Sequence, residues 1–466
     1  MVAPAQPEQL AAVDDVIQAE MERLKIPGLA VGVLQDGKTE TRGYGVASLR
    51  TGQPVTADTL FQIGSITKSF TATLIMQLVD DGLLDLDAPV ARAVPELRLK
   101  DAQALAGLTP RHLLAHTCGF YGDRFTDYGW GADALAKAIA TFDELEQQLP
   151  PGELFSYANT GYQLLGRIVE KLREEVYETV ARERLLKPLG MEAACFFAHE
   201  AIVQPNSVGH APPQPGAELE IARPYPIPRA MNAAGAIIAP VGDLLRYAAL
   251  HMSDGTVQAA RRLLGEAPDE GENTRLLRAD SLAAMQTGVA PTGTIGQSYA
   301  LGWMVEEVDG VRLVSHGGST NGFRAHLLFA PRRQAAIAWL SNSPGGATAW
   351  PAVRKAWLTR ALGLTVTEPA AVTLSGAELL AYAGEYARPN QRITVTAQDG
   401  GLSLTVDQVG GLDGKRTVLP PISAEPLGEG HFRLTSGDAI GNEVQFLTSR
   451  DGRRFLRFGL RLVERT

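Results

Sequence analysis

A run of apolar residues with helical spacing follows Gly64 and ends before Gly82. Phe70, Leu74, Ile75 and Leu78 recur at intervals of three and four, which is typical of one buried helix face. Glycine is a common helix terminator. The pattern therefore predicts a helix that begins at Ser65 and ends before Gly82.

Further apolar patterns predict one antiparallel sheet assembled from both ends of a long first region. Residues 8 to 24 are predicted to form an amphipathic helix, and the segment from Ala349 to Leu362 another. Alternation around Gln35-Asp36-Gly37 predicts a hairpin. The strands expected are Ala30–Leu34, Thr39–Ala47, Val311–Ser315, Ala325–Ala330 and Ala335–Leu340. The middle, roughly residues 85 to 290, is expected to be mostly helical, with the cleft between it and the sheet.

The pattern changes after Thr367-Glu368-Pro369, where short alternating segments separated by glycine turns take over. Asp399-Gly400-Gly401 and Asp451-Gly452 indicate hairpins, and short strands at regular spacing favour a closed barrel. The expected strands are Ile393–Ala397, Leu402–Val406, His431–Thr435, Val444–Leu447 and Phe455–Phe458. The fold class is thus α+β followed by an all-β barrel, with domains over residues 1–365 and 366–466.

Composition excludes several classes of protein. The 466 residues carry a net charge of −9, and no basic aromatic stripe offsets it, so a nucleic-acid partner is not expected. No apolar run approaches the roughly 20 residues that span a bilayer. Met1-Val2-Ala3-Pro4 has no features of a signal peptide. The protein is therefore expected in the cytoplasm, or exported with its signal absent from this sequence.

The start of the predicted helix carries candidate chemistry, because Ser65 and Lys68 stand three residues apart. A helix places residues i and i+3 on one face, so Lys68 would lie beside the Ser65 hydroxyl. Serine is a nucleophile only with a base nearby, and lysine is a base only when burial lowers its pKa from about 10.4. Backbone N–H groups at the helix start would favour a developing oxyanion.

Two more short motifs follow in order, Tyr157-Ala158-Asn159 and His316-Gly317-Gly318-Ser319. Each alone has an ordinary structural explanation: a surface lysine after a cap, a core tyrosine with an N-cap asparagine, and a turn. S-x-x-K and Y-x-N occur once each, and the order of nucleophile, bases and oxyanion site indicates acyl transfer through a serine ester.

These segments resemble the serine hydrolases related to class C β-lactamases and penicillin-binding proteins, over about residues 8 to 362. The resemblance rests on the segments 61–70, 113–119, 150–162, 299–303 and 316–323. Cys118 and Ala158 stand where serine is common in the family. Gly384-Glu385-Tyr386 after a short helix more weakly resembles the start of a lipocalin-like domain that is attached to some of these hydrolases.

The resemblance implies roles for the candidate site residues. Ser65 would be the nucleophile, Lys68 and Tyr157 would form the base system, and either could be the acylation base. Asn159 would orient Lys68 or a substrate amide. His316, Gly318 and Ser319 would form the oxyanion and substrate-binding strand, with the Ser65 and Ser319 N–H groups on the oxyanion.

His316 departs from the Lys-Thr-Gly motif of β-lactamases. A histidine is mostly neutral at pH 7, so a fixed charge for a substrate carboxylate is lost. The pattern favours the esterases and D-aminopeptidases of the family, acting on small esters, amides or D-residue peptides. A β-lactamase or a slowly deacylating penicillin-binding protein is the alternative, and a non-catalytic binding protein with a hydrolase-like cleft is another.

Cofactors and metals are not expected. The eight histidines include no H-E-x-x-H motif, and the two cysteines, Cys118 and Cys195, form no C-x-x-C pair. His112 and His116 are four apart but lack an acidic partner at ligand spacing, so they are taken as structural. The expected partner is a small-molecule substrate, and exposed barrel edges make a homo-oligomer an open expectation.

Overall fold

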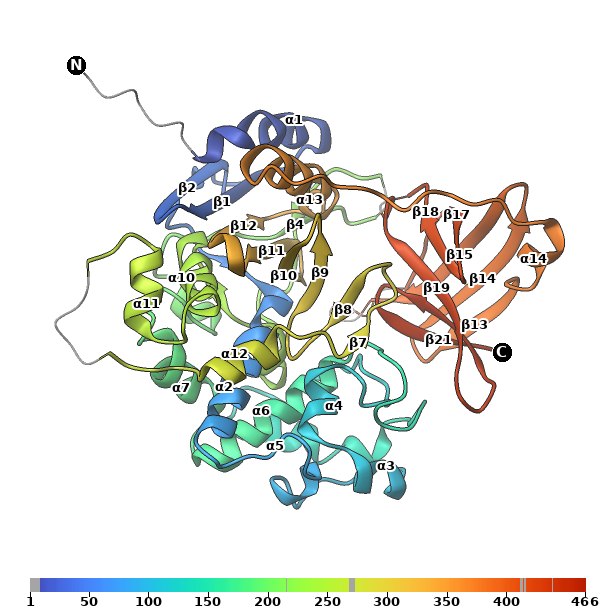
Figure 1. Cartoon of the computed structure of the whole chain (residues 1–466), viewed down its shortest axis with the longest axis horizontal. Coiled ribbons are helices and arrows are strands. Elements are labelled where there is room, and N and C mark those ends of the chain that lie inside the picture. Colours follow the sequence, from blue (N-terminus) through green and yellow to red (C-terminus); the bar gives the residue numbers. More distant parts are fainter. Residues whose placement is uncertain (1–8, 215, 268–272, 411–413, 415, 438) are drawn as a thin grey trace.

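The structure is a computed structural model that describes residues 9–214, 216–267, 273–410, 414, 416–437 and 439–466. It confirms the α+β class with a following β-barrel. Figure 1 shows the barrel on one side of the larger helix-and-sheet part, next to β7 and β8. No helix in these described ranges is long and apolar enough to cross a membrane. The boundary between residues 365 and 366 stays a prediction.

The first region is built on an antiparallel sheet with strand order β2-β1-β12-β11-β10-β9-β8-β7. The predicted hairpin and three later strands are present in it, and β10 runs five residues further than expected. The strands are β1 (Gly28–Gln35), β2 (Lys38–Gly45), β7 (Ala290–Pro291), β8 (Gln297–Tyr299), β9 (Met304–Val308), β10 (Val311–Thr320), β11 (Phe323–Ala330) and β12 (Ala335–Ser341).

Helices cover both faces of this sheet, which explains why β1 is buried along nearly its whole length. Val31 and Val33 pack on the face covered by α1 (Asp14–Leu24) and α13 (Gly345–Ala356). Ala30 and Leu34 belong to the core on the opposite face, which α10 (Val241–Met252) covers. The N-terminal helix is shorter than predicted: a 3₁₀ turn, Gln9–Ala12, precedes α1, and residue 8 lies outside the described residues.

The middle of the chain is mostly helical, as expected. Helix α2 (Thr67–Asp80) precedes this region. The helices within it are α10, already described, and α3 (Ala102–Gly107), α4 (Pro110–Leu114), α5 (Ala134–Ile139), α6 (Asn159–Arg173), α7 (Tyr177–Ala181), α8 (Ala198–Ala201), α9 (Asn232–Gly235), α11 (Val257–Leu263) and α12 (Ala279–Met285). Two short strand pairs interrupt it: β3 (Phe61–Gln62) with β6 (Ile238–Ala239), and β4 (His210–Ala211) with β5 (Glu220–Ile221).

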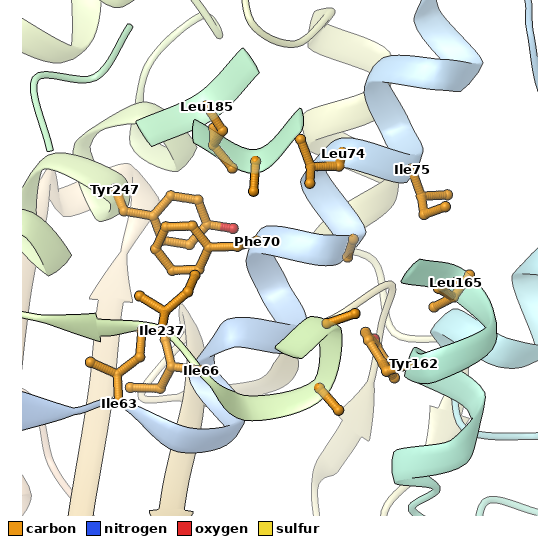
Figure 2. Close-up of a cluster of buried hydrophobic side chains, with 14 of the residues drawn as sticks. Ile63, Ile66, Phe70, Leu74, Ile75, Tyr162, Leu165, Leu185, Ile237 and Tyr247 are labelled. Carbon is orange, nitrogen blue, oxygen red and sulfur yellow. The ribbon is translucent and has the colours of Figure 1, made fainter. Parts of the chain in front are cut away.

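Helix α2 is the central element of the first region, and its residues are buried from Thr67 to Leu78. Phe70 stacks on Tyr247 of α10, with ring centroids 3.6 Å apart (Figure 2). Leu74 and Ile75 continue the same apolar core, each adding roughly 1.5–3 kcal/mol by full burial. Because α2 is enclosed on all sides, the residues at its start are held in fixed positions.

The C-terminal region closes into a barrel because β14 pairs with both β13 and β15. Helix α14 (Gly376–Leu380) precedes it. The strands are β13 (Gly384–Arg388), β14 (Gln391–Gln398), β15 (Gly401–Val409), β16 (Arg416–Val418), β17 (Ile422–Gly428), β18 (His431–Leu434), β19 (Glu443–Thr448), β20 (Arg454–Phe458) and β21 (Arg461–Arg465). The sequence pattern missed β13, β16, β17 and β21. β16 has only three residues, and β17 follows Pro420-Pro421 and contains Pro426, which argues against a strand in a sequence pattern.

Candidate active site

Ser65 lies at the start of α2, within a short 3₁₀ turn formed by Gly64–Ile66. The helix proper begins at Thr67, two residues later than the sequence predicted, since the tighter turn absorbs the entry of the chain. Ser65 is partly exposed, whereas Gly64 and Ile66 on either side are buried. A rigid helix start thus presents the serine hydroxyl at an accessible surface.

Lys68 is fully buried on the same helix face, with its Nζ atom 3.0 Å from Ser65 Oγ. Its Nζ also donates to the carbonyl of Ala234, at 2.6 Å. Burial, and then the nearby positive charge of Arg461, hold the pKa of Lys68 well below its ordinary value. A lysine in this position is able to be neutral near pH 7 and to accept a proton.

Tyr157 lies two residues before α6 and next to Lys68. The Lys68 Nζ atom is 5.0 Å from the centre of the Tyr157 ring. Burial raises the pKa of Tyr157, although Ser65 and Arg461 act to lower it. Its phenol oxygen is buried and makes no hydrogen bond of normal geometry with any residue that the structure describes. At neutral pH this group is a protonated phenol, able to donate to a reacting atom.

Strand β10 approaches Ser65 closely, and two glycines permit the contact. A side-chain carbon on Gly318 would lie 1.9 Å from the carbonyl oxygen of Ile63. One on Gly64, where φ is +53°, would lie 2.5 Å from the backbone nitrogen of Ser319. Only glycine fits at either position. The Ser65 and Ser319 backbones are thereby brought next to each other, at the place expected for an oxyanion site.

His316 is buried on β10 and is held as a neutral imidazole. Its Nδ1 atom donates to the Gly317 carbonyl, at 2.6 Å, so Nε2 accepts from the Tyr299 hydroxyl, at 3.0 Å. Burial, and then the charge of Lys68, lower the pKa of His316 to about 3. This side chain supplies no positive charge for a substrate carboxylate at neutral pH.

Asn159 is the first residue of α6, and Ala158 rather than Asn159 is its N-cap. Its Nδ2 atom donates to Asp123 Oδ1, at 2.9 Å. Asp123 also pairs with Arg461 and Arg388 from the barrel. The structure therefore places Asn159 in a charged network that joins the two regions.

Sequence reasoning placed Ser65, Lys68, Tyr157, Asn159, His316, Gly318 and Ser319 at one site. The structure brings Ser65, Lys68, Tyr157, His316, Gly318 and Ser319 together. Asn159 lies two residues after Tyr157, but its side chain bonds Asp123 and not Lys68. Sequence reasoning missed Asp123, Arg461 and Tyr299 as site residues. Asp123 follows the segment 113–119 by only a few residues, and Tyr299 begins the segment 299–303. Arg461 carried no signal, because it stands in a strand that was not predicted.

Two further titratable groups of the segment 113–119, Cys118 and His116, are buried. Burial raises the pKa of the Cys118 thiol to about 12. The His116 ring contacts that of Tyr157, with ring centres 4.1 Å apart and the planes tilted by 33°, and its Nδ1 accepts from the Ala158 N–H. Within the described ranges, no three His, Cys, Asp or Glu side chains are grouped so that they could hold a metal ion.

Comparison with known proteins identifies the family of this site. The family model described as Beta-lactamase matches residues 13–361. Penicillin-binding protein 4 of Amycolatopsis lactamdurans is 34% identical over 326 residues, covering 68% of this chain and 81% of that protein. A β-lactamase of Yersinia enterocolitica is 25% identical over 348 residues, 71% of this chain and 86% of its own. The chain belongs to the β-lactamase family of serine hydrolases, which includes penicillin-binding proteins.

A solved structure resembles the whole chain, including the barrel. The crystal structure of SurE aligns with a TM-score of 0.74 and 27% identity, covering 98% of this chain and 99% of SurE. SurE has also been solved with D-Leu. The association of a β-lactamase-like region with a following barrel is therefore shared with another protein.

Proposed function

We propose that this protein is a serine hydrolase that forms an acyl-enzyme at Ser65 and acts on small esters, amides or peptides, including those with D-residues. The observation that carries the proposal is the buried Lys68, with its Nζ 3.0 Å from Ser65 Oγ and its pKa well below the ordinary value because of burial. A neutral lysine at hydrogen-bonding distance is the base that a serine nucleophile needs.

The proposed acylation step assigns different work to Lys68 and Tyr157. Ser65 Oγ bonds to the substrate carbonyl carbon while its proton passes to Lys68 Nζ, and the carbonyl oxygen becomes an oxyanion near the Ser65 and Ser319 N–H groups. The bond to the leaving group then breaks, and the Tyr157 phenol donates its proton to that group. Lys68 returns its proton to Tyr157, directly or through water, which restores both residues.

Deacylation reverses the roles, with water in place of the leaving group. A water molecule gives a proton to the Tyr157–Lys68 pair as its oxygen attacks the ester carbon. The ester bond breaks, and Ser65 Oγ takes the proton back. The raised pKa of Tyr157 favours its use as a proton donor and relay over its use as the resting base.

The neutral His316 supports esters and D-residue amides over β-lactams, since it leaves the strand without the lysine charge that would hold a carboxylate. The crystal structure of SurE with D-Leu supports a D-residue substrate. The second candidate, acylation by β-lactams, is favoured by the 34% identity to penicillin-binding protein 4.

Three substrates distinguish these outcomes when each is tested with the wild-type protein and Ser65→Ala: p-nitrophenyl acetate, D-alanine p-nitroanilide and nitrocefin. We expect turnover of the first two that is lost in Ser65→Ala, and slow or no turnover of nitrocefin. Fast nitrocefin turnover would instead establish a β-lactamase. Undiminished ester hydrolysis by Ser65→Ala would refute Ser65 as the nucleophile. No turnover of any of the three substrates by the wild-type protein, with no labelling of Ser65 by a fluorophosphonate, would leave a binding protein.

A further inference from the structure

The hairpin between β20 and β21 reaches from the barrel into the candidate active site. Its turn is Gly459-Leu460, and both residues have positive φ, +55° and +68°. This is a two-residue hairpin turn, but its second residue is a leucine, for which a left-handed backbone is unfavourable. Such strain persists only where surrounding contacts hold it.

Contacts with the hydrolase region hold Leu460 in place. Its carbonyl accepts from the Tyr157 N–H, at 2.9 Å, and its side chain packs on the cluster of Phe155, Tyr157 and Tyr299. The next residues continue the contact, since the Leu462 N–H donates to Ser156 Oγ, at 3.2 Å. The turn is therefore fastened to the segment that carries the catalytic tyrosine.

Arg461 follows this turn and lies against two site residues. Its guanidinium carbon is 5.1 Å from the centre of the Tyr157 ring. Its Nη2 donates to Asp123 Oδ1, at 3.0 Å, and its Nε donates to Oδ2 of the same carboxylate. This two-pronged geometry fixes both the arginine and the carboxylate.

Asp123 receives a second cation from the barrel, because Arg388 Nη1 donates to its Oδ2, at 3.2 Å. The Asp123 side chain is only 6% exposed. Burial alone would raise the pKa of Asp123, but Arg461 and Arg388 outweigh it and keep the pKa below its ordinary value. The charged carboxylate thus depends on the barrel, since a buried charge without its partner is strongly destabilising.

Asp123 in turn holds the start of α6. It lies in an irregular loop and accepts from Asn159. The preceding loop residues bond the same helix start, with the Thr160 N–H donating to the Gly122 carbonyl, at 3.0 Å. A chain of contacts therefore runs from the barrel through Asp123 to Asn159.

The described part of the barrel interior is packed with apolar side chains. Aromatic rings contribute to this core, with Phe446 in contact with Tyr382, Tyr386 and Phe432 at centroid distances of 4.9–5.6 Å. The β20–β21 hairpin, on the outside of the barrel, contacts the candidate active site.

We propose that the β20–β21 hairpin completes the active site, with Arg461 and Arg388 acting as positioning residues that, through Asp123, fix Asn159 and the Tyr157 ring beside Ser65. The inference rests on the proposed hydrolase function. In this proposal the barrel positions active-site residues, in addition to packing against the first region.

A purely structural contact and a positioning contact differ in their effect on pH dependence. Arg461 disfavours the charged form of Lys68, so its loss would raise the pKa of that lysine. Activity that needs neutral Lys68 would then begin at a higher pH. The other groups near Lys68 are Ser65, Tyr157, Tyr162, His116, His316 and Asp123.

The test compares Arg461→Met, Arg461→Lys and Asp123→Asn in the full chain with Arg453→Met as the matched control. Arg453 is also a barrel arginine that bonds the hydrolase region, donating to the Gln148 carbonyl at 2.7 Å, but it does not contact Tyr157 or Asp123. For each variant, kcat and KM for p-nitrophenyl acetate are measured across pH, together with thermal unfolding.

For Arg461→Met we expect kcat to fall by about 100-fold, the effect of misplacing catalytic groups by about an ångström, with little change in KM. The ascending limb of its plot of kcat against pH should move to higher pH. Arg461→Lys should retain the wild-type limb and recover part of kcat, because the charge remains. Asp123→Asn should lower kcat by a similar factor, and the double variant Asp123→Asn/Arg461→Met should lose little more than either single one.

Equal losses in Arg461→Met and Arg453→Met, with no shift of the pH limb, would overturn the proposal. If Arg461→Met does not fold, the decision falls to Arg461→Lys against Arg453→Lys, and equal kcat in those two would overturn it as well. Failure of the hydrolase function itself would be seen separately, in wild-type protein that neither turns over ester nor labels at Ser65.

Discussion

Replacing Gly318 with alanine tests the close approach of β10 to Ser65, the proposed nucleophile. The added carbon would lie 1.9 Å from the Ile63 carbonyl oxygen and 2.8 Å from its carbon. Both are backbone atoms, so no side-chain rotation relieves the overlap. To restore ordinary contact at about 3.5 Å, the two backbones must separate by more than about an ångström.

That displacement exceeds what an oxyanion site tolerates, because donors act only within roughly 2.7–3.1 Å of the developing charge. Ser319 is the next residue on the displaced strand and would carry its N–H away from Ser65. Losing one such donor costs about 2.7–4 kcal/mol in the transition state. We therefore expect Gly318→Ala to lower kcat for p-nitrophenyl acetate by about 10²–10³-fold.

Gly317→Ala is the matched control on the adjacent residue of the same strand. Its added carbon would lie 3.2 Å from His326 Nδ1, a contact that a shift of a few tenths of an ångström relieves. We expect a change in kcat of less than about fivefold there, or about 1 kcal/mol. Steady-state kinetics give kcat for each variant. Circular dichroism and thermal unfolding give the folded fraction by which each kcat is corrected. Folded Gly318→Ala with kcat within threefold of wild type would refute the reasoning.

Three further perturbations test other parts of the site and core. Lys68→Met should slow labelling of Ser65 by a fluorophosphonate about 10²–10⁴-fold, the usual contribution of a general base, and normal labelling would remove Lys68 from that role. His251 is buried, and burial lowers its pKa to about 3, so the unfolded state binds more protons below about 6.5. The free energy of unfolding, measured in urea, should therefore fall as pH drops from about 6.5 toward 3. In His251→Gln this fall should be smaller. An unchanged dependence of the unfolding free energy on pH would show that other groups are responsible. Tyr299→Phe removes the donor to His316 Nε2 and leaves a buried acceptor unpaired, so thermal or urea unfolding should show a loss of about 1–3 kcal/mol, against an unchanged value if the bond contributes nothing.

The local parts of the site could be predicted from the sequence. The three-residue spacing of Ser65 and Lys68 places them on one face of any helix, and the apolar repeat after Gly64 indicates that helix. The hairpin around Asp36-Gly37 and the glycine turns of the barrel also follow from patterns within a few residues. These features depend on backbone periodicity and turn chemistry, which neighbouring residues determine.

The electrostatic state of the site was decided only by the tertiary structure. The pKa of Lys68 is low because residues far apart in the chain enclose it, and His316 is neutral because Tyr299 and the core surround it. The pairing of Asp123 with Arg461 joins residues 338 positions apart. No local pattern marks such a contact, since burial and charge pairing arise only when the sheet, the helices and the barrel are packed together.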